Sequence, residues 1–254
     1  MTDSTRRPAR KLGFGFWSFL ALMLGLTVLF AWLGVWQVQR LAEKEALLAE
    51  VGEQLQQPPA ALPPAEEWDR LDLEDYAYSS VQLTGSYLEN STVFVFTNLP
   101  EPKGERGGPG YWVMTAFEPE TGGTVFVNRG FIPQASIADF RDEPVPQGEQ
   151  SITGIALPRE GSGSFTPEPD IANRIEWVRD PARLAAMAGL QGPVLGLTVD
   201  APAGEPGALP QGGETVIEFP NNHLGYAMTW FGFALLTPGL LAVWVRRQLR
   251  PVAG

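Results

Sequence analysis

The stretch FGFWSFLALMLGLTVLFAWLGVW, residues Phe14–Trp36, contains no Asp, Glu, Lys or Arg. A helix of about 20 apolar residues crosses the ~30 Å hydrocarbon layer of a bilayer, so this run is long enough to span a membrane. A second uncharged run extends from Leu224 to Val245. Both runs are rich in Leu, Phe, Trp and Gly, which is typical of spanning helices. They predict two transmembrane helices, one near each end of the chain.

Basic residues flank both runs on the side of the chain ends. Four precede the first run and three follow the second: Arg6, Arg7, Arg10, Lys11, Arg246, Arg247 and Arg250. The positive-inside rule then places both termini in the cytoplasm, although Arg40 and Lys44 after the first run weigh weakly against this. The first run lacks a small-residue cleavage site and is long for a signal peptide, so we expect an uncleaved anchor. The short basic leader favours a bacterial inner membrane.

The region between the runs is strongly acidic. It holds 28 of the 29 acidic residues and 11 of the 18 basic ones, and therefore carries a net charge of −17. Such a surface repels phosphate backbones, so nucleic-acid binding is not expected. The absence of cysteine excludes disulfides, thiolate catalysis, iron–sulfur ligation and covalent attachment of c-type haem. Metal sites with several His or Cys ligands are excluded too, and no pattern of an enzyme active site is evident, so no enzyme activity is expected.

Short runs of alternating β-branched and aromatic residues begin near Tyr76 and predict strands, with Gly122-Gly123 as a hairpin turn between two of them. Asp180, Pro181 and Gly189 are the signals that cap, start and end one short helix.

The predicted fold class is a membrane protein in which two transmembrane helices flank a mainly β, barrel-like α+β domain. Its expected parts are a cytoplasmic N-terminus (1–12), a first transmembrane helix (13–36), a helical extension (37–57) ended by prolines that form a stiff connector, a periplasmic β-rich domain (58–222), a second transmembrane helix (223–245) and a cytoplasmic C-terminus (246–254).

His223 is the only histidine and stands at the start of the second uncharged run. Asn221 and Asn222 are good helix N-caps, so the helix is predicted to begin at about His223. His223, Tyr226, Ala227 and Trp230 then share one helix face. An imidazole above aromatic side chains suits an iron porphyrin, because His is a common axial ligand. The alternative is a polar residue that caps the helix at the membrane surface.

Small residues offer a way for the two predicted spans to pack closely. Gly225, Thr229 and Gly232 line one side of the second span, and Ala21 and Gly25 line one side of the first. Small residues at such positions let helix backbones approach each other. They predict a two-helix hairpin.

Arg129 follows a predicted strand in VNRGFIP, residues 127–133. An arginine at such a strand end could bind a carboxylate or a porphyrin propionate, or form a salt bridge of purely structural value.

Three blocks together resemble the surfeit-locus (Surf/Shy-type) cytochrome oxidase assembly family. LGVWQVQRLAEKEALL is similar to its G-x-W-Q-x-x-R-x-x-x-K motif, through Gly34, Trp36, Gln37 and Arg40. GYWVMTAFEPETGGTVFVNRGFIP resembles the family's central block, with Ala116 and Phe131 in place of the usual Pro and Trp. The N-N-H-L-x-Y-A-x-T-W-F ending is matched by NNHLGYAMTWF.

This resemblance implies an inner-membrane assembly factor for aa3-type cytochrome c oxidase. It implies non-covalent binding of haem a, with His223 as the iron ligand, and delivery to the oxidase's catalytic subunit after receipt from haem a synthase. We expect Tyr226, Trp230 and Trp36 to pack on the macrocycle, and Arg40 and Arg129 to bind its propionates. Membrane lipid is the other expected partner. The alternative is a scaffold that stabilises the nascent oxidase subunit without binding haem.

Overall fold

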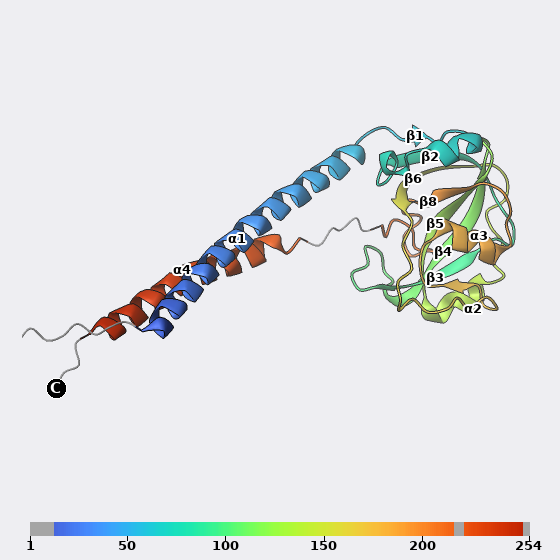
Figure 1. Cartoon of the computed structure of the whole chain (residues 1–254). Coiled ribbons are helices and arrows are strands. Elements are labelled where there is room, and N and C mark those ends of the chain that lie inside the picture. The colour runs from blue at the N-terminus through green and yellow to red at the C-terminus, as the bar shows by residue number, and fades with distance from the viewer. Residues whose placement is uncertain (1–12, 216–220, 251–254) are drawn as a thin grey trace, which may run out of the picture. The chain divides into compact units, whose positions relative to one another are not determined.

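The computed structural model describes residues 13–215 and 221–250, and these residues form two compact units. One unit contains the two long helices apart from the last residues of the first, and the other, from Glu50 to Glu218, contains those residues and the β-sheet (Figure 1). The expected cytoplasmic segment 1–12 and the last four residues of the expected cytoplasmic C-terminus lie outside the described residues.

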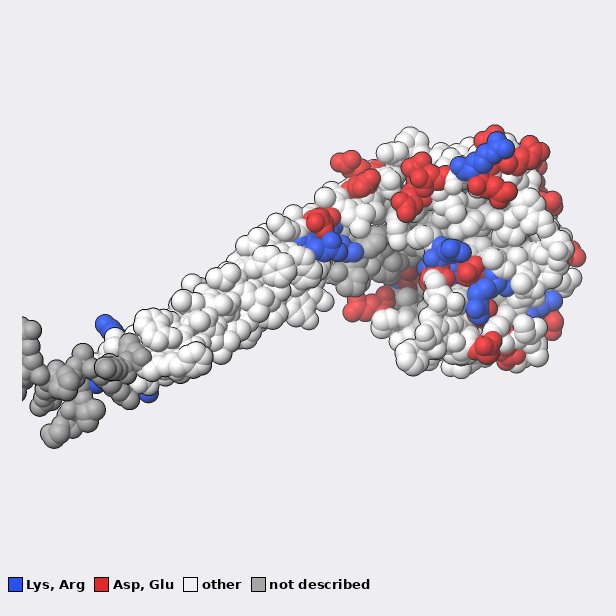
Figure 2. All heavy atoms as spheres, in the orientation of Figure 1, with Lys and Arg blue, Asp and Glu red and all other residues white. Residues whose placement is uncertain are grey.

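The two predicted spans are helices. α1 (Phe14–Gln54) and α4 (His223–Leu249) are both long and apolar enough to cross a membrane. Only 6% of the most apolar window of α1 and 11% of that of α4 is buried, whereas the core helix of a soluble protein would be mostly covered. Figure 2 shows broad uncharged surface along the helices, while acidic side chains are spread over the sheet-containing unit. These features fit a membrane protein.

The predicted strands are present, and the short helices lie between them. The strands are β1 (Ala60–Ala61), β2 (Ser80–Tyr87), β3 (Val93–Leu99), β4 (Gly108–Pro119), β5 (Thr124–Pro133), β6 (Gln150–Pro158), β7 (Ile175–Glu176) and β8 (Val194–Asp200), and the other helices are α2 (Ile137–Phe140), α3 (Pro181–Ala188) and the 3-10 helices Ala65–Arg70, Leu73–Asp75 and Gln134–Ser136. α1 ends at Gln54, three residues short of the expected 57. The proline-rich connector is more than a spacer, because Ala60 and Ala61 pair with β2 as a short parallel strand.

The sheet closes on itself. Its order is β1-β2-β6-β8-β5-β4-β3-β7, and β2 also pairs with the last residues of β4, so β2, β6, β8, β5 and β4 form a small barrel. Within this barrel the pairings are antiparallel except for the parallel pair β5–β8. The two-residue strands β1 and β7, outside the barrel, pair in parallel with β2 and β3. The strands at the two ends of the order, β1 and β7, have only two residues each, and such short edges lower the risk of edge-to-edge aggregation. The predicted barrel-like α+β domain is confirmed.

Alternation along the strands builds the core. One buried cluster includes Val81, Phe117, Val127 and Leu197. Another includes Met114 and Phe126 and is covered by Leu184 of α3. The Asp180 carboxylate caps α3 by accepting from Ala182 N at 3.0 Å, and Gly189 ends the helix at φ 70°, as the sequence predicts. Gly122 and Gly123, at φ 81° and 75°, form the predicted β4–β5 turn.

Candidate functional site

α1 and α4 pack against each other in antiparallel orientation, and aromatic side chains make much of the contact. The Phe16 and Trp244 rings stack with centroids 5.1 Å apart near one end of the pair, and the Phe30 and Trp230 rings stack at 5.8 Å further along. Gly34 leaves room for the Phe231 ring, since a Cβ at Gly34 would lie 2.6 Å from Phe231 Cε1. The close packing of α1 against α4 therefore depends on one glycine and several large aromatic rings.

The predicted small-residue seam is wrong. A Cβ added at Gly25, Gly225 or Gly232 would meet nothing within 4 Å, so these glycines face open space. Ala21 and Thr229 are exposed as well. The helices instead approach each other along the face of Gly34 and Ala227, of which Ala227 is 2% exposed. The sequence contains small residues on several faces, and the bulky aromatic contacts select this one.

His223 is the first residue of α4, as expected. Asn222 occupies the N-cap position, but its side chain makes no capping hydrogen bond. Asn221 Oδ1 accepts from His223 N at 3.4 Å instead, which is a weak bond. The backbone of His223, and not its ring, therefore takes part in this contact at the helix start.

The His223 ring forms a hydrogen bond with the other helix. Its Nδ1 lies 2.7 Å from Oε1 of Gln37, a side chain that is only 8% exposed. An amide oxygen can only accept, so this bond requires the hydrogen on Nδ1. In the neutral imidazole the lone pair is then on Nε2, the nitrogen through which the ring can bind a metal ion. This donor set fits an iron porphyrin with one protein ligand.

The other residues on the helices that are expected to contact haem differ in their exposure. Tyr226 and Trp36 are 57% and 42% exposed, and Trp230 is half-buried against Phe30. Arg40, one helical turn beyond Gln37, pairs with Glu43 at 2.6 Å. Both side chains of this ion pair are exposed, so it contributes little stability and leaves the Arg40 guanidinium able to exchange partners.

Arg129 lies in the barrel domain. Its guanidinium carbon is 5.9 Å from the centroid of the Tyr87 ring, within reach of a cation–π contact. Burial raises the pKa of Tyr87 to about 12, and the charge of Arg129 acts against that rise. The expected contact of Arg129 with a propionate stays a prediction.

Because the pKa of Tyr87 is raised, we expect the folded protein to lose stability at alkaline pH. Its folded-state pKa lies above the ordinary 10.0, so the contribution of the neutral phenol is complete below pH 10 and disappears as the pH rises through about 12. Between these limits we expect the unfolding free energy of the wild type to fall by about 2 kcal/mol relative to Tyr87→Phe. Urea unfolding of both proteins at pH 9 and pH 11.5 measures this difference. Parallel pH profiles of the two proteins would contradict it.

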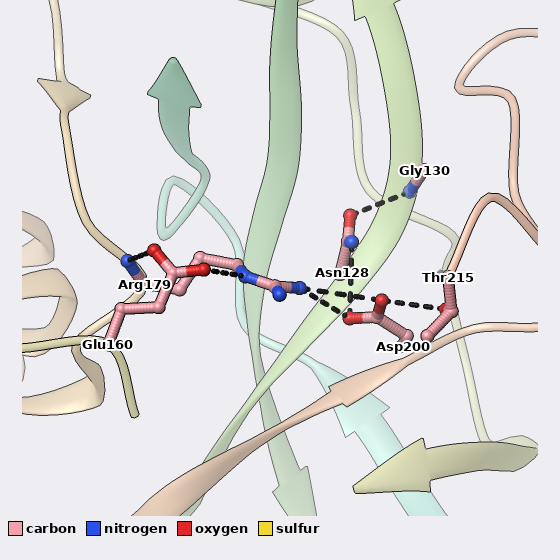
Figure 3. A network of polar contacts seen from close by, with 6 residues as sticks. All are labelled: Asn128, Gly130, Glu160, Arg179, Asp200 and Thr215. Carbon is pink, nitrogen blue, oxygen red and sulfur yellow. Dashed lines mark hydrogen bonds and ion pairs between the residues drawn. The ribbon is translucent and has the colours of Figure 1, made fainter. Parts of the chain in front are cut away.

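Asn128 and Gly130, the neighbours of Arg129 in the central motif, have structural roles. Asn128 Nδ2 donates to Asp200 Oδ1 at 3.1 Å, and Asn128 Oδ1 accepts from Gly130 N at 3.0 Å (Figure 3). Gly130 has φ +133°, and a Cβ there would lie 2.5 Å from Gln211 O. The motif thus sets the path of the chain at the end of β5.

Asp200 is the centre of a polar network in the barrel domain. Its carboxylate accepts from Arg179 Nη1 at 3.2 and 3.4 Å and from Thr215 Oγ1 at 2.7 Å, and Arg179 Nε donates to Glu160 Oε1 at 3.0 Å (Figure 3). The network borders a cleft of about 640 Å³. Because these charged groups already have partners, the network is best explained as a structural brace. Within residues 13–215 and 221–250, no group of three His, Cys, Asp or Glu side chains could hold a metal ion.

Gln37 is a site residue that the sequence did not identify as an iron ligand or a haem contact. It belongs to the first motif, between Trp36 and Arg40. The available signal was an amide at the end of an uncharged span, where an unpartnered polar group is costly. The sequence of one helix does not show which residue faces His223 on another.

Comparison with known proteins identifies the family of this chain. The SURF1 family model matches residues 24–235. The chain is similar to a SURF1-like protein of Monosiga brevicollis, at 31% identity over 96% of this chain and 92% of the relative. It is also similar to Surfeit locus protein 1 of Homo sapiens, at 30% identity over 93% and 80%, and to that of Rattus norvegicus, at 28% identity over 87% and 73%. The resemblance carried by the three motifs is confirmed, and the chain belongs to the SURF1 family.

Proposed function

We propose that this chain is a membrane-anchored assembly factor for aa3-type cytochrome c oxidase, and that it holds haem a on His223 for insertion into the oxidase's catalytic subunit. Membership of the SURF1 family supports the assembly role. The observation that supports the haem proposal is the 2.7 Å contact between His223 Nδ1 and Gln37 Oε1, because it puts the lone pair of the neutral ring on Nε2.

Each residue has a role in this proposal. His223 supplies the one axial ligand, and the exposed rings of Trp36 and Tyr226, together with Trp230, offer apolar surface to the macrocycle. Arg40 can leave its exposed ion pair with Glu43 to bind a propionate. A carrier must also release its cargo, so an affinity limited to one ligand and surface packing suits the function. Such a carrier makes and breaks no covalent bond in its cargo.

Charge and helix direction support the location that we propose. Antiparallel spans put both chain ends on one side of a membrane, and the seven flanking basic residues favour the cytoplasmic side. The barrel domain would then face the periplasm of a bacterial inner membrane. Haem a synthase, itself the source of the cargo, would be the donor partner.

The test is a haem measurement on the full-length protein. The chain is purified in mild detergent from cells that make haem a and from matched cells in which haem a synthase is deleted, and its visible spectrum and haem content are recorded. We expect haem a, at up to one per chain, only in the first preparation. A first preparation without haem would contradict the carrier proposal, and rescue of oxidase assembly by the same protein would then favour the scaffold alternative.

A further inference from the structure

We propose that Gln37 is a positioning residue for His223, which fixes the hydrogen on Nδ1 and so directs Nε2 to the iron. This inference rests on the proposed function, since it concerns the ligand of the haem that the chain is proposed to carry. Gln37 itself touches no haem in this account. It acts through the imidazole ring.

The first support is the geometry of the pair. The Nδ1–Oε1 distance of 2.7 Å is short for a nitrogen donor and an oxygen acceptor. Iron-ligating histidines commonly donate their other ring nitrogen to a carbonyl or carboxylate oxygen, and that bond sets both the tautomer and the orientation of the ring. The Gln37 amide oxygen is placed to do the same.

The second support is burial. Among the described residues of the helix pair, Gln37 and Thr237 are the buried polar side chains, at 8% and 7% exposed. Thr237 donates to Phe233 O of its own helix, so it needs no partner elsewhere. Gln37 instead uses the imidazole of the other helix. A buried amide is costly without a partner, so this contact holds both side chains in place.

The experiment begins with the haem-free protein. Because the chain has one histidine, labelling with [¹⁵N]histidine gives ring signals from His223 alone, provided that the purification tag contains no histidine. We expect one N–H signal assigned to Nδ1 and one unprotonated signal assigned to Nε2. In Gln37→Met, which keeps the length of the side chain but has no oxygen acceptor, we expect a mixture of tautomers. Gln37→Glu keeps an acceptor and should keep the Nδ1–H form.

The haem-loaded protein gives the second readout. We expect Gln37→Met to retain haem a about tenfold less well than wild type, as is typical when the partner of a ligating histidine is lost. Gln37→Glu should restore retention and raise the iron–imidazole stretching frequency of the ferrous protein, because a carboxylate increases the basicity of the ring. Gln39→Met is the matched control, because Gln39 is exposed on the same helix and should change neither readout.

The outcomes separate the two proposals. A wild type that carries no haem would overturn the proposed function, whatever the tautomer of His223. Haem in the wild type together with an Nε2–H tautomer, or with Gln37→Met equal to wild type in both readouts, would overturn the role of Gln37 alone.

Discussion

Replacing His223 with alanine is expected to lower the haem a retained by the purified full-length chain more than tenfold. The chain has no other histidine and no cysteine, so no second imidazole or thiolate of its own can replace the lost iron–nitrogen bond. The aromatic side chains would still offer packing surface, but a loss of only 1.4 kcal/mol already lowers affinity tenfold. The haem content per chain and the visible spectrum measure the effect.

Two controls make the His223→Ala result specific. Asn222→Ala changes the neighbouring exposed residue, whose side chain caps nothing, and should retain haem like wild type. Free imidazole added to His223→Ala should restore part of the retention, because it can occupy the space of the missing ring and ligate the iron. Full retention of haem with an unchanged spectrum in His223→Ala would exclude His223 as the ligand.

Replacing Gly130 with alanine is expected to destabilise the barrel domain by about 3 kcal/mol or more. A side chain at φ +133° is strained, and its Cβ would lie 2.5 Å from Gln211 O and 2.6 Å from Gly212 N. The backbone of Gln211 cannot move away without breaking two hydrogen bonds. Phe131 N donates to Gln211 O at 2.9 Å, and Gln211 N donates to Phe131 O at 2.8 Å. The Gln211 side chain also bonds both backbone groups of Arg106.

Thermal unfolding of the full-length protein, followed by tryptophan fluorescence, measures the effect of Gly130→Ala. Gly192→Ala is the matched control, because Gly192 also has a positive φ, +106°, but a Cβ there would meet nothing within 4 Å. Gly192→Ala should be destabilised only by the backbone strain, by about 1 kcal/mol. Equal losses in the two variants would show that the close approach of Gln211 is unimportant.

The sequence predicted the local parts of this fold and missed their long-range connections. Alternating residues identified the strands, and Gly122-Gly123 and Asp180 identified a turn and a cap, because each signal depends on neighbours in the chain. The pairing of β2 with β4 that closes the barrel, and the strand formed by Ala60 and Ala61, depend on partners far away in sequence. No local pattern specifies them.

The candidate site, too, could be predicted only in part from the sequence. The uniqueness of His223 and its place at the start of a span were visible in the sequence. Its partner Gln37 is 186 positions away and was found only when the contact face of each helix was known. The predicted seam through Gly225 and Gly232 was wrong for the same reason, since a helix with small residues on several faces does not by itself indicate which one is covered.

The bond between His223 and iron is the central claim, and an isotope shift tests it most directly. Haem-loaded wild-type protein is prepared with [¹⁵N]histidine and with unlabelled histidine, and the resonance Raman spectrum of each ferrous form is recorded. Because all label resides in the one histidine, the account predicts an iron–imidazole stretching band that moves to lower frequency in the labelled protein. Bound haem a with no band that responds to the label would contradict it.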